Sequence, residues 1–587
     1  MNIHLRKFSH KFMNKIRITQ DQKLSLKLTS ADTLYELSGT FDLAGEVLEI
    51  PSGCVLKFDE GTRIANGTLS LNNTVFEGAQ HSIAALVNGT QEELDTDAFD
   101  LTGSDKVAIM QSIVSTARII QLHGRFKNVF DNIKIGYKET TLVGNGAIIE
   151  NTAITTQAIT ITSDDFIKIS DLEFYVSSGY AIYKNANLTT ETKLSFIIDK
   201  CRFVSTYNGP ESNPYPAIIQ LLGSREGNIT NCFFQGEGFG SSIGIDRTLV
   251  VNTNVIGCMF SNLSYGIRAI GASSTSLNPI EDYSVYACGL NVQSAVMLGC
   301  KYGIYIEGND SFFLNNSMID FCAAPLVLIS QDGANITNNY FSTSQTLLNN
   351  FDYHATITAK NNTSAGIANR NQRIIISNNT IYGHRTINNY GIDMDVESKD
   401  CIIQGNTFNS CIGFSIHLFN VNNWSTEKLV IDNNRFYFSS NVLIGIGDNT
   451  YTGSEQILIS NNCAYAANLS GCKLVKAGSQ TFGTYIYHNN RFRTSVSAPT
   501  SGDNEPQFFW GKQKSTTRFR FNLSFPASST EMNITNPLSD ANAVVYIGNN
   551  KVAICVKSIS ASKIYFTKSS TNAAISFTAI IEHMNNI

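Results

Sequence analysis

The chain has 587 residues, of which 16% are charged, and its formal net charge is -5. Globular chains usually carry about 25% charged residues, so uncharged polar residues take an unusual share of this surface. The lack of a basic excess excludes an electrostatically driven nucleic-acid partner. No apolar run is long enough to span a bilayer and no apolar stretch follows the basic start, so the sequence predicts neither membrane insertion nor a signal peptide.

Residues 1–30 form the first segment, in which apolar residues recur at helical spacing. The apolar positions are Leu5, Phe8, Phe12 and Ile16, and the basic residues between them are Arg6, Lys7, Lys11, Lys15 and Arg17. This pattern predicts a basic amphipathic helix that docks or oligomerises the protein. A frayed tail and a transit peptide are the alternatives.

Residues 31–143 form the second segment. The stretch "FDLAGEVLEIPSGCVLKFDEGTRIANG" alternates apolar and polar residues between glycine, proline and asparagine turns, which predicts short β-layers. After it, "SDKVAIMQSIVST" predicts a helix near residues 104–116 with Ser104 as its N-cap. We expect this helix to cover the open edge of the coils that follow, because an exposed sheet edge invites aggregation.

A strand-like phrase recurs every 26 to 31 residues through much of residues 144–495. Examples are "FIIDKCRF" ending at Phe203, "IIQGNTF" ending at Phe408 and "VIDNNRF" ending at Phe436. Apolar residues at alternate positions are typical of strands, and a second short strand such as "YGIDMDV" often follows a glycine. This period, with two or three strands per unit, predicts an all-β protein whose body is a parallel β-helix of about ten to thirteen coils.

The repeated phrase carries an asparagine or a cysteine two residues before its final aromatic residue or isoleucine. These positions are Asn339, Asn379, Asn406, Asn434 and Asn490, and Cys201, Cys232, Cys258 and Cys463. We predict that they lie at an interior turn, where asparagines stack and hydrogen-bond along a ladder and cysteines act as small apolar fillers. Because four cysteines share this phase and no CxxC pair occurs, we predict buried free thiols rather than disulfides or metal ligands.

The repeat ends at residues 496–507, a linker rich in proline, glycine and serine. Residues 508–587 alternate as strands, for example "ANAVVYIGNN" and "SKIYFTKSS". We expect a small β-sandwich-like cap that serves in trimerisation or receptor binding.

Candidate catalytic residues lie at outward positions of the second strand of the coils. In "YGIDMDV", alternation points Asp393 and Asp395 outward, with their Cα atoms about 6.5 to 7 Å apart. In the next coil, "IGFSIHL", Ser415 and His417 point outward, and the glycine register places Asp395 beside His417. Two carboxylates and an imidazole suit hydrolysis of a glycosidic bond, so Asp393, Asp395 and His417 are the predicted catalytic residues. The alternative is a solvated β-face without a catalytic role.

Candidate glycan-binding residues follow from the same register and from one loop. They are Arg268, Tyr305, Glu307 and Ser415 on the strands, and Trp424 on a loop, where an indole can stack on a sugar ring. No phosphate-binding loop, dinucleotide fingerprint or zinc spacing occurs, so no cofactor and no metal are predicted.

A helix and short strand, then "GNGAIIEN" and the repeated "I-x-N-N-x-F" coils, resemble the pectate-lyase superfamily of right-handed β-helices over about residues 95–494. The basic start, β-helical body and separate β-rich end resemble bacteriophage tailspikes and tail fibres. The stretch that opens with "FDLAGEVLEI" is similar to the openings of β-helical proteins from gut Bacteroides and their phages. The Gly-His-Gly and Arg-Ile-Lys elements of polygalacturonases are missing, and a pectate-lyase calcium cluster is not legible.

The resemblance implies a homotrimeric virion tail protein, made in the host cytoplasm, that binds a host cell-surface polysaccharide, with depolymerisation of that polysaccharide left open. Its N-terminal segment would join it to other virion tail proteins. A free polysaccharide lyase or glycoside hydrolase and a non-catalytic adhesive or structural rod are the alternatives. The sequence does not decide whether the protein is an enzyme, whether it would be a hydrolase or a lyase, or which glycan it binds.

Overall fold

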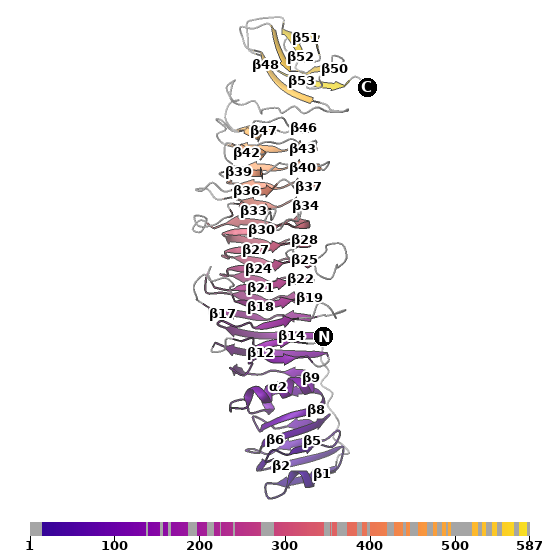
Figure 1. Cartoon of the computed structure of the whole chain (residues 1–587), viewed down its shortest axis with the longest axis vertical. Helices are drawn as coiled ribbons and strands as arrows, with labels where there is room; N and C mark the ends of the chain where they lie inside the picture. Colours follow the sequence, from indigo (N-terminus) through magenta and orange to yellow (C-terminus); the bar gives the residue numbers. More distant parts are fainter. Residues whose placement is uncertain are drawn as a thin grey trace. The chain divides into compact units, whose positions relative to one another are not determined.

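The computed structural model describes residues 14–136, 139–152, 156–162, 166–185, 196–207, 216–223, 225–238, 241–271, 287–344, 353, 355–360, 372–383, 390–395, 400–411, 413–419, 428–437, 442–446, 456–466, 473–477, 484–488, 491–494, 519–525, 531–535, 543–548, 554–560, 562–568 and 575–583. The chain forms two compact units. The first unit comprises Met1–Phe313 and Ser317–Pro325, and the second comprises Leu314–Asn316 and Leu326–Ile587. In each unit most strands belong to two parallel sheets, which we call the major sheet and the minor sheet of that unit (Figure 1).

The first unit opens with a small parallel sheet. Its strands, in spatial order, are β1 (Asn14–Thr19), β2 (Thr33–Ser38), β5 (Val55–Phe58) and β7 (Val75–Glu77), and the short helix α1 (Leu24–Lys27) follows β1.

The major sheet of the first unit contains the strands of the repeated phrase. Its strands are β3 (Thr40–Asp42), β4 (Val47–Glu49), β6 (Arg63–Asn72), β8 (Ile83–Asp95), β9 (Ala117–Gln121), β10 (Arg125–Lys127), β12 (Thr140–Asn151), β14 (Ile167–Val176), β16 (Phe196–Asp199), β17 (Arg202–Ser205), β19 (Arg225–Thr230), β20 (Phe233–Gln235), β22 (Val251–Ile256), β23 (Met259–Ser261), β25 (Ala287–Gln293), β26 (Val296–Leu298) and β29 (Met318–Cys322). The minor sheet of this unit consists of β11 (Ile133–Ile135), β13 (Ile159–Ile161), β15 (Ile182–Asn185), β18 (Ala217–Leu222), β21 (Ile243–Thr248), β24 (Tyr265–Ile270) and β27 (Tyr302–Glu307). Strands β28 (Asn309–Asn315) and β30 (Ala324–Ile329) each contribute residues to both units.

The predicted N-terminal helix is wrong where the structure describes it. Ile16 lies in strand β1, which pairs in parallel with β2, while Leu5, Phe8 and Phe12 lie outside the described residues. The cause is the local period: Ile16 and Ile18 are two residues apart with Arg17 between them, and Ile18 is fully buried.

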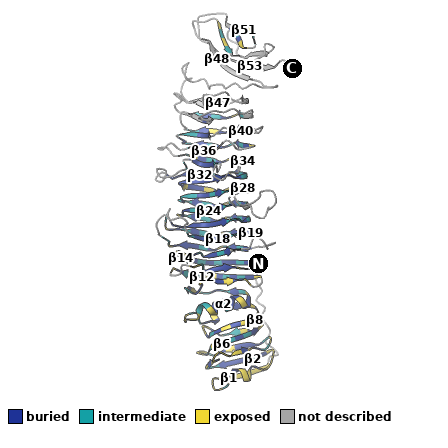
Figure 2. Cartoon of the chain, in the orientation of Figure 1, coloured by how far each residue is buried: buried dark blue, intermediate teal, exposed yellow. Residues whose placement is uncertain are grey.

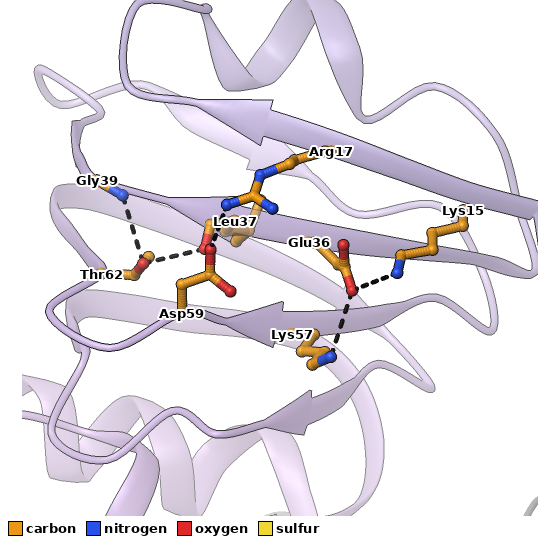
Figure 3. Close-up of polar contacts among 8 residues, drawn as sticks. All are labelled: Lys15, Arg17, Glu36, Leu37, Gly39, Lys57, Asp59 and Thr62. Carbon is orange, nitrogen blue, oxygen red and sulfur yellow. Dashed lines mark hydrogen bonds and ion pairs between the residues drawn. The ribbon is translucent and has the colours of Figure 1, made fainter.

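The basic residues of β1 bind acidic residues of the neighbouring coils. Lys15 contacts Glu36 at 2.8 Å and Lys57 contacts the same carboxylate at 3.3 Å, while Arg17 contacts Asp59 at 2.9 Å (Figure 3). This charged ladder anchors the first strand to the coils behind it.

Helix α2 (Lys106–Thr116) packs on β8, β9 and β11 (Figure 1). Its buried face consists of Ile109, Met110, Ile113, Val114 and Thr116. The N-cap is Asp105, one residue after the predicted Ser104.

Aromatic rings fill the interior of the first unit. Phe174, Phe203, Phe234 and Phe260 occupy one register position of neighbouring strands, and all four are fully buried. Successive ring centroids lie 5.0, 4.9 and 4.7 Å apart in stacked geometry. The period of the sequence therefore reflects core residues that stack on their equivalents in neighbouring coils. Buried residues occur along the strands of each unit (Figure 2).

The second unit continues the same pattern of sheets. Its major-sheet strands are β31 (Asp332–Thr337), β32 (Tyr340–Thr343), β34 (Gln372–Ser377), β35 (Thr380–Tyr382), β37 (Cys401–Gln404), β38 (Thr407–Asn409), β40 (Lys428–Asp432), β41 (Arg435–Tyr437), β43 (Gln456–Ser460), β44 (Cys463–Ala466), β46 (Thr484–His488) and β47 (Arg491–Thr494). Its minor-sheet strands, besides β30, are β33 (Ala355–Lys360), β36 (Tyr390–Asp395), β39 (Phe414–Phe419), β42 (Val442–Ile446) and β45 (Lys473–Ala477).

The paired asparagines of the repeat have two different tasks. The first of each pair adopts the left-handed conformation that a tight turn requires, as Asn378 (φ 55°) and Asn433 (φ 52°) do. The second points inward and forms the predicted ladder, which runs through Asn339, Asn379, Asn406, Asn434 and Asn462. Asn490 lies outside the described residues.

One cysteine of the predicted interior phase is misplaced. Cys463 is only partly buried and pairs with the exposed Arg435, whereas Asn462 is fully buried. The cause is that Ala464, not Tyr465, occupies the core position opposite Phe436. The nine cysteines whose state the structure describes are all free, as predicted.

The C-terminal strands form two antiparallel sheets. The first, in spatial order, consists of β48 (Phe519–Phe525), β53 (Ile575–His583) and β50 (Ala543–Gly548), and the second of β49 (Glu531–Thr535), β52 (Lys563–Lys568) and β51 (Ile554–Ile559).

The prediction of an all-β, right-handed parallel β-helix is confirmed. Among the residues described above, no helix has the length and apolar character that crossing a membrane would need.

Candidate functional site

A column of polar and aromatic side chains runs across the minor sheet of the first unit. Tyr183, Gln220, Asp246, Arg268 and Tyr305 occupy one register position of the neighbouring strands β15, β18, β21, β24 and β27. The residue before each in these strands is an isoleucine that is fully buried in the coil interior: Ile182, Ile219, Ile245, Ile267 and Ile304. Because side chains of a strand alternate, the column faces outward.

A cleft of about 510 Å³ lies over part of this column. Its floor comes from β15, β18, β21 and β24, and the segments around Tyr180, Tyr207 and Pro216 add to its walls. The lining residues are Ser178, Tyr180, Tyr183, Tyr207, Pro216, Gln220, Leu222, Asp246, Thr248 and Arg268. This volume lies in the range of small-molecule sites, and the lining combines aromatic rings with hydroxyls and an amide.

A bidentate ion pair forms the polar centre of the cleft. Arg268 donates from Nε to Oδ1 of Asp246 at 2.9 Å and from Nη2 to Oδ2 at 2.6 Å. The Asp246 side chain is 3% exposed and that of Arg268 is 16% exposed. Burial lowers the pKa of Arg268, whereas its hydrogen bonds to Asp246 and the charge of that carboxylate raise it. The net effect is a raised pKa, so the guanidinium stays charged.

Tyrosine rings flank this pair. Tyr180 and Tyr183 stack with their centroids 5.5 Å apart, and the guanidinium of Arg268 lies 5.7 Å from the centroid of the Tyr265 ring. Burial, and then the negative charge of Asp246, raise the pKa of Tyr180, so its hydroxyl remains a hydrogen-bond donor at neutral pH.

The predicted glycan-binding residues Arg268, Tyr305 and Glu307 lie together at one end of this region. The Tyr305 hydroxyl donates to Glu307 at 3.0 Å, and its ring meets the edges of the stacked rings of Tyr265 and Tyr302. Sequence reasoning missed Asp246, although it follows a Gly-Ile pair in "IGIDRT" as Arg268 does in "YGIRAI". The same register would have predicted it.

A second polar cluster lies on the minor sheet of the second unit. Asp393 Oδ1 and His417 Nδ1 are 2.8 Å apart, and Lys360 Nζ is 3.8 Å from Asp393 Oδ2. The imidazole stacks against the rings of both Tyr390 and Phe414, with centroids 4.6 and 4.9 Å away, and those two rings lie 5.6 Å from each other. A buried carboxylate beside an imidazole can serve as an acid–base pair, since the carboxylate fixes the orientation of the ring.

This cluster differs from the predicted one. The strand register places Asp393 opposite His417 and Asp395 opposite Phe419, so the predicted neighbour of His417 is wrong. Ser415 is fully buried, and the register places it opposite Gly391. A Cβ atom built on Gly391 would contact the core residues Phe408 and Cys411, so this position faces the interior of the coil.

The inward position of Ser415 removes it from the outer surface. Phe414 is partly exposed and stacks on His417 of the outer face. Inward and outward side chains therefore do not alternate strictly in the residues before Ile416. Trp424 and the side chain of Asp395 lie outside the described residues.

One group of described side chains is arranged as metal ligands would be. The ligand atoms of Asp95, Asp97 and His123 all lie within 4.8 Å of one another. Asp95 already accepts the Asp97 amide at 2.9 Å and approaches His123 at 3.5 Å, and both carboxylates are exposed. These contacts account for the cluster without an ion.

No family model matches the chain, and no curated protein matches it. Among solved structures, the chain is similar to a double mutant of the tailspike protein of E. coli bacteriophage HK620, with 10% identity over 97% of this chain and 87% of that one and a TM-score of 0.44. The HK620 tailspike in complex with a pentasaccharide gives 9% identity over 92% and 87% of the two chains and a TM-score of 0.41. A double mutant of the periplasmic alginate epimerase AlgG gives 11% identity over 60% and 77% and a TM-score of 0.38. At these identities the similarities assign neither site residues nor a ligand.

Proposed function

We propose that this protein binds a polysaccharide, and that the cleft over β15, β18, β21 and β24 holds part of the saccharide chain. One observation carries the proposal: stacked tyrosines and hydrogen-bonding groups converge in a cleft of about 510 Å³ on a rigid parallel sheet. A sugar ring has an apolar face of C–H groups and a rim of hydroxyls. Tyrosine rings suit the face, while Gln220, Thr248 and the tyrosine hydroxyls suit the rim.

The biological setting we propose is the tail of a virion, where the chain would recognise a host surface polysaccharide. The combination of a basic start, β-helical coils and a separate β-rich end supports this setting, as does the low charge of the surface. Attachment to other tail proteins through the N-terminal segment and assembly as a homotrimer belong to the same proposal.

Substitution of Tyr183 by alanine tests the cleft. Loss of one stacking ring should weaken binding of host polysaccharide by about tenfold. Tyr382→Ala is the matched control, because Tyr382 is 36% exposed on the major sheet of the second unit, away from the cleft residues in sequence and sheet. Equal affinity of the Tyr183 variant and wild type, by titration calorimetry, would contradict the proposal.

Light scattering on the full-length chain tests the assembly. A homotrimer has a mass of about three times 64.4 kDa. A monomeric mass would instead favour a free carbohydrate-active protein.

Cleavage of the bound glycan is a second candidate function, and the buried Asp393–His417 pair favours it. Asp393→Asn and His417→Ala should each abolish release of reducing ends from host polysaccharide while binding through the cleft persists. Unchanged cleavage by both variants would mean that another site cleaves the glycan, whereas no cleavage by wild type would leave binding as the sole function.

A further inference from the structure

The two charges that line the cleft cancel each other. Among the described lining residues, Asp246 and Arg268 carry charge, and they form one bidentate pair with both carboxylate oxygens engaged. The remaining lining groups are rings, hydroxyls, an amide and small apolar surfaces. A ligand in the cleft therefore meets a dipole rather than a net charge.

Among the described basic residues that adjoin cleft residues in sequence, none adds an accessible cation. Lys184 and Arg247 lie next to cleft residues in sequence, but they belong to inward-facing positions and are 2% and 0% exposed, so a ligand cannot contact them. On β27, beyond Arg268, the next ionised group of the outer face is the carboxylate of Glu307.

We infer that the cleft selects uncharged sugar residues and discriminates against uronic or sialic acid units. This inference rests on the proposed glycan binding. A sugar carboxylate that enters the cleft would lose hydration and face the Asp246 carboxylate, while the guanidinium that could offset its charge is already neutralised. A neutral sugar loses no ionic hydration and can accept from the Arg268 N–H groups that Asp246 leaves unused.

Release of Arg268 should reverse the preference. In Asp246→Asn the guanidinium loses its counter-charge and becomes available to a sugar carboxylate, with which it can form the same two-point contact. Glu173→Gln is the matched control, because Glu173 contacts Arg202 at 3.3 Å on the major sheet and its loss changes the net charge equally.

The experiment uses the full chain on an array of uronic-acid oligosaccharides printed beside their carboxyl-reduced counterparts. Wild type and Glu173→Gln should bind the reduced, neutral members at least tenfold better than the acidic ones. Asp246→Asn should bind the acidic members at least tenfold better than wild type does. The double variant Asp246→Asn/Arg268→Gln removes both charges and should keep the neutral preference, which keeps the inference testable if the single variant does not fold.

Two results would overturn the inference in distinguishable ways. Preference of wild type for acidic members, lost in Tyr183→Ala, would mean that the cleft binds glycans but takes anions. Absence of binding to every member and to host polysaccharide would remove the proposed function together with the inference.

Discussion

Asn406 donates twice to one oxygen of Asn434: its Nδ2 lies 3.1 Å and its backbone N 3.0 Å from Asn434 Oδ1. Asn434 in turn donates from Nδ2 to Asn462 Oδ1 at 3.0 Å and to the carbonyl of Ile403 at 2.9 Å. All three asparagines are fully buried. Each buried amide thus uses its acceptor toward one coil and its donors toward others, which removes the cost of burying it.

Asn434→Asp should destabilise the second unit by about 3 kcal/mol. The carboxylate cannot donate, so its bonds to Asn462 and Ile403 become contacts between acceptors in a buried site. Asn433→Asp is the control, because Asn433 is exposed and aspartate tolerates its positive φ of 52°. Thermal unfolding followed by circular dichroism checks this, and a midpoint equal to that of the control would refute the ladder's role.

The repeat was readable from the sequence because one buried position per coil restricts the residue type strongly. At Asn339 and Asn434 the side chain must hydrogen-bond to the equivalent asparagine of the next coil. The same residue type therefore recurs once per coil and gives the sequence a clear period. Cys463 is misassigned when Tyr465 is counted as the final core residue. Ala464 occupies that position opposite Phe436, and this one-residue shift moves the interior position from Cys463 to Asn462.

The contacts of the outer face were harder to predict from the sequence, because packing does not restrict the residue type at outward positions. The pairing of His417 with Asp393 rather than Asp395 follows from the strand register, which places Ile392 opposite Ile416 and so differs by two residues from an alignment of the glycines, an offset that the sequence does not reveal. The cleft depends on Tyr180 and Tyr207, which lie outside the strands. Strand periodicity contains no information on such segments.

Buried thiols should resist alkylation in the native protein. A hydrogen bond with Cys201 raises the pKa of Cys232, and a hydrogen bond with Cys232 raises that of Cys258. Burial raises the pKa of Cys411 to about 12. At pH 8 a thiol with that pKa has roughly a thousandfold less thiolate than an ordinary cysteine.

Mass spectrometry after iodoacetamide treatment checks this at each site. Cys232, Cys258 and Cys411 should be labelled only in denaturant. Cys463, which is partly exposed, is the internal control and should be labelled first. Rapid native labelling of Cys258 would mean that the coil around it opens.

The N-terminal strand should loosen in acid, because Glu36 holds it through Lys15. The hydrogen bond from Lys15 lowers the pKa of Glu36, burial opposes this, and Lys57 adds to the lowering. Since the folded pKa lies below the unfolded value of about 4.3, the stabilisation is complete above that pH and is lost as the pH falls through the folded pKa.

Hydrogen exchange of β1 amides tests this ladder, because among the described strands β1 pairs with β2 alone, at the end of its sheet. Glu36→Gln should lower β1 protection factors at pH 7 to a level that wild type reaches only in acid. Glu49→Gln removes an exposed carboxylate on β4 of the same unit and should leave β1 protection unchanged. If β1 of the Glu36 variant stays as protected as wild type at pH 7, backbone pairing with β2 alone holds the strand, and the basic residues of β1 are then free to contribute to attachment instead.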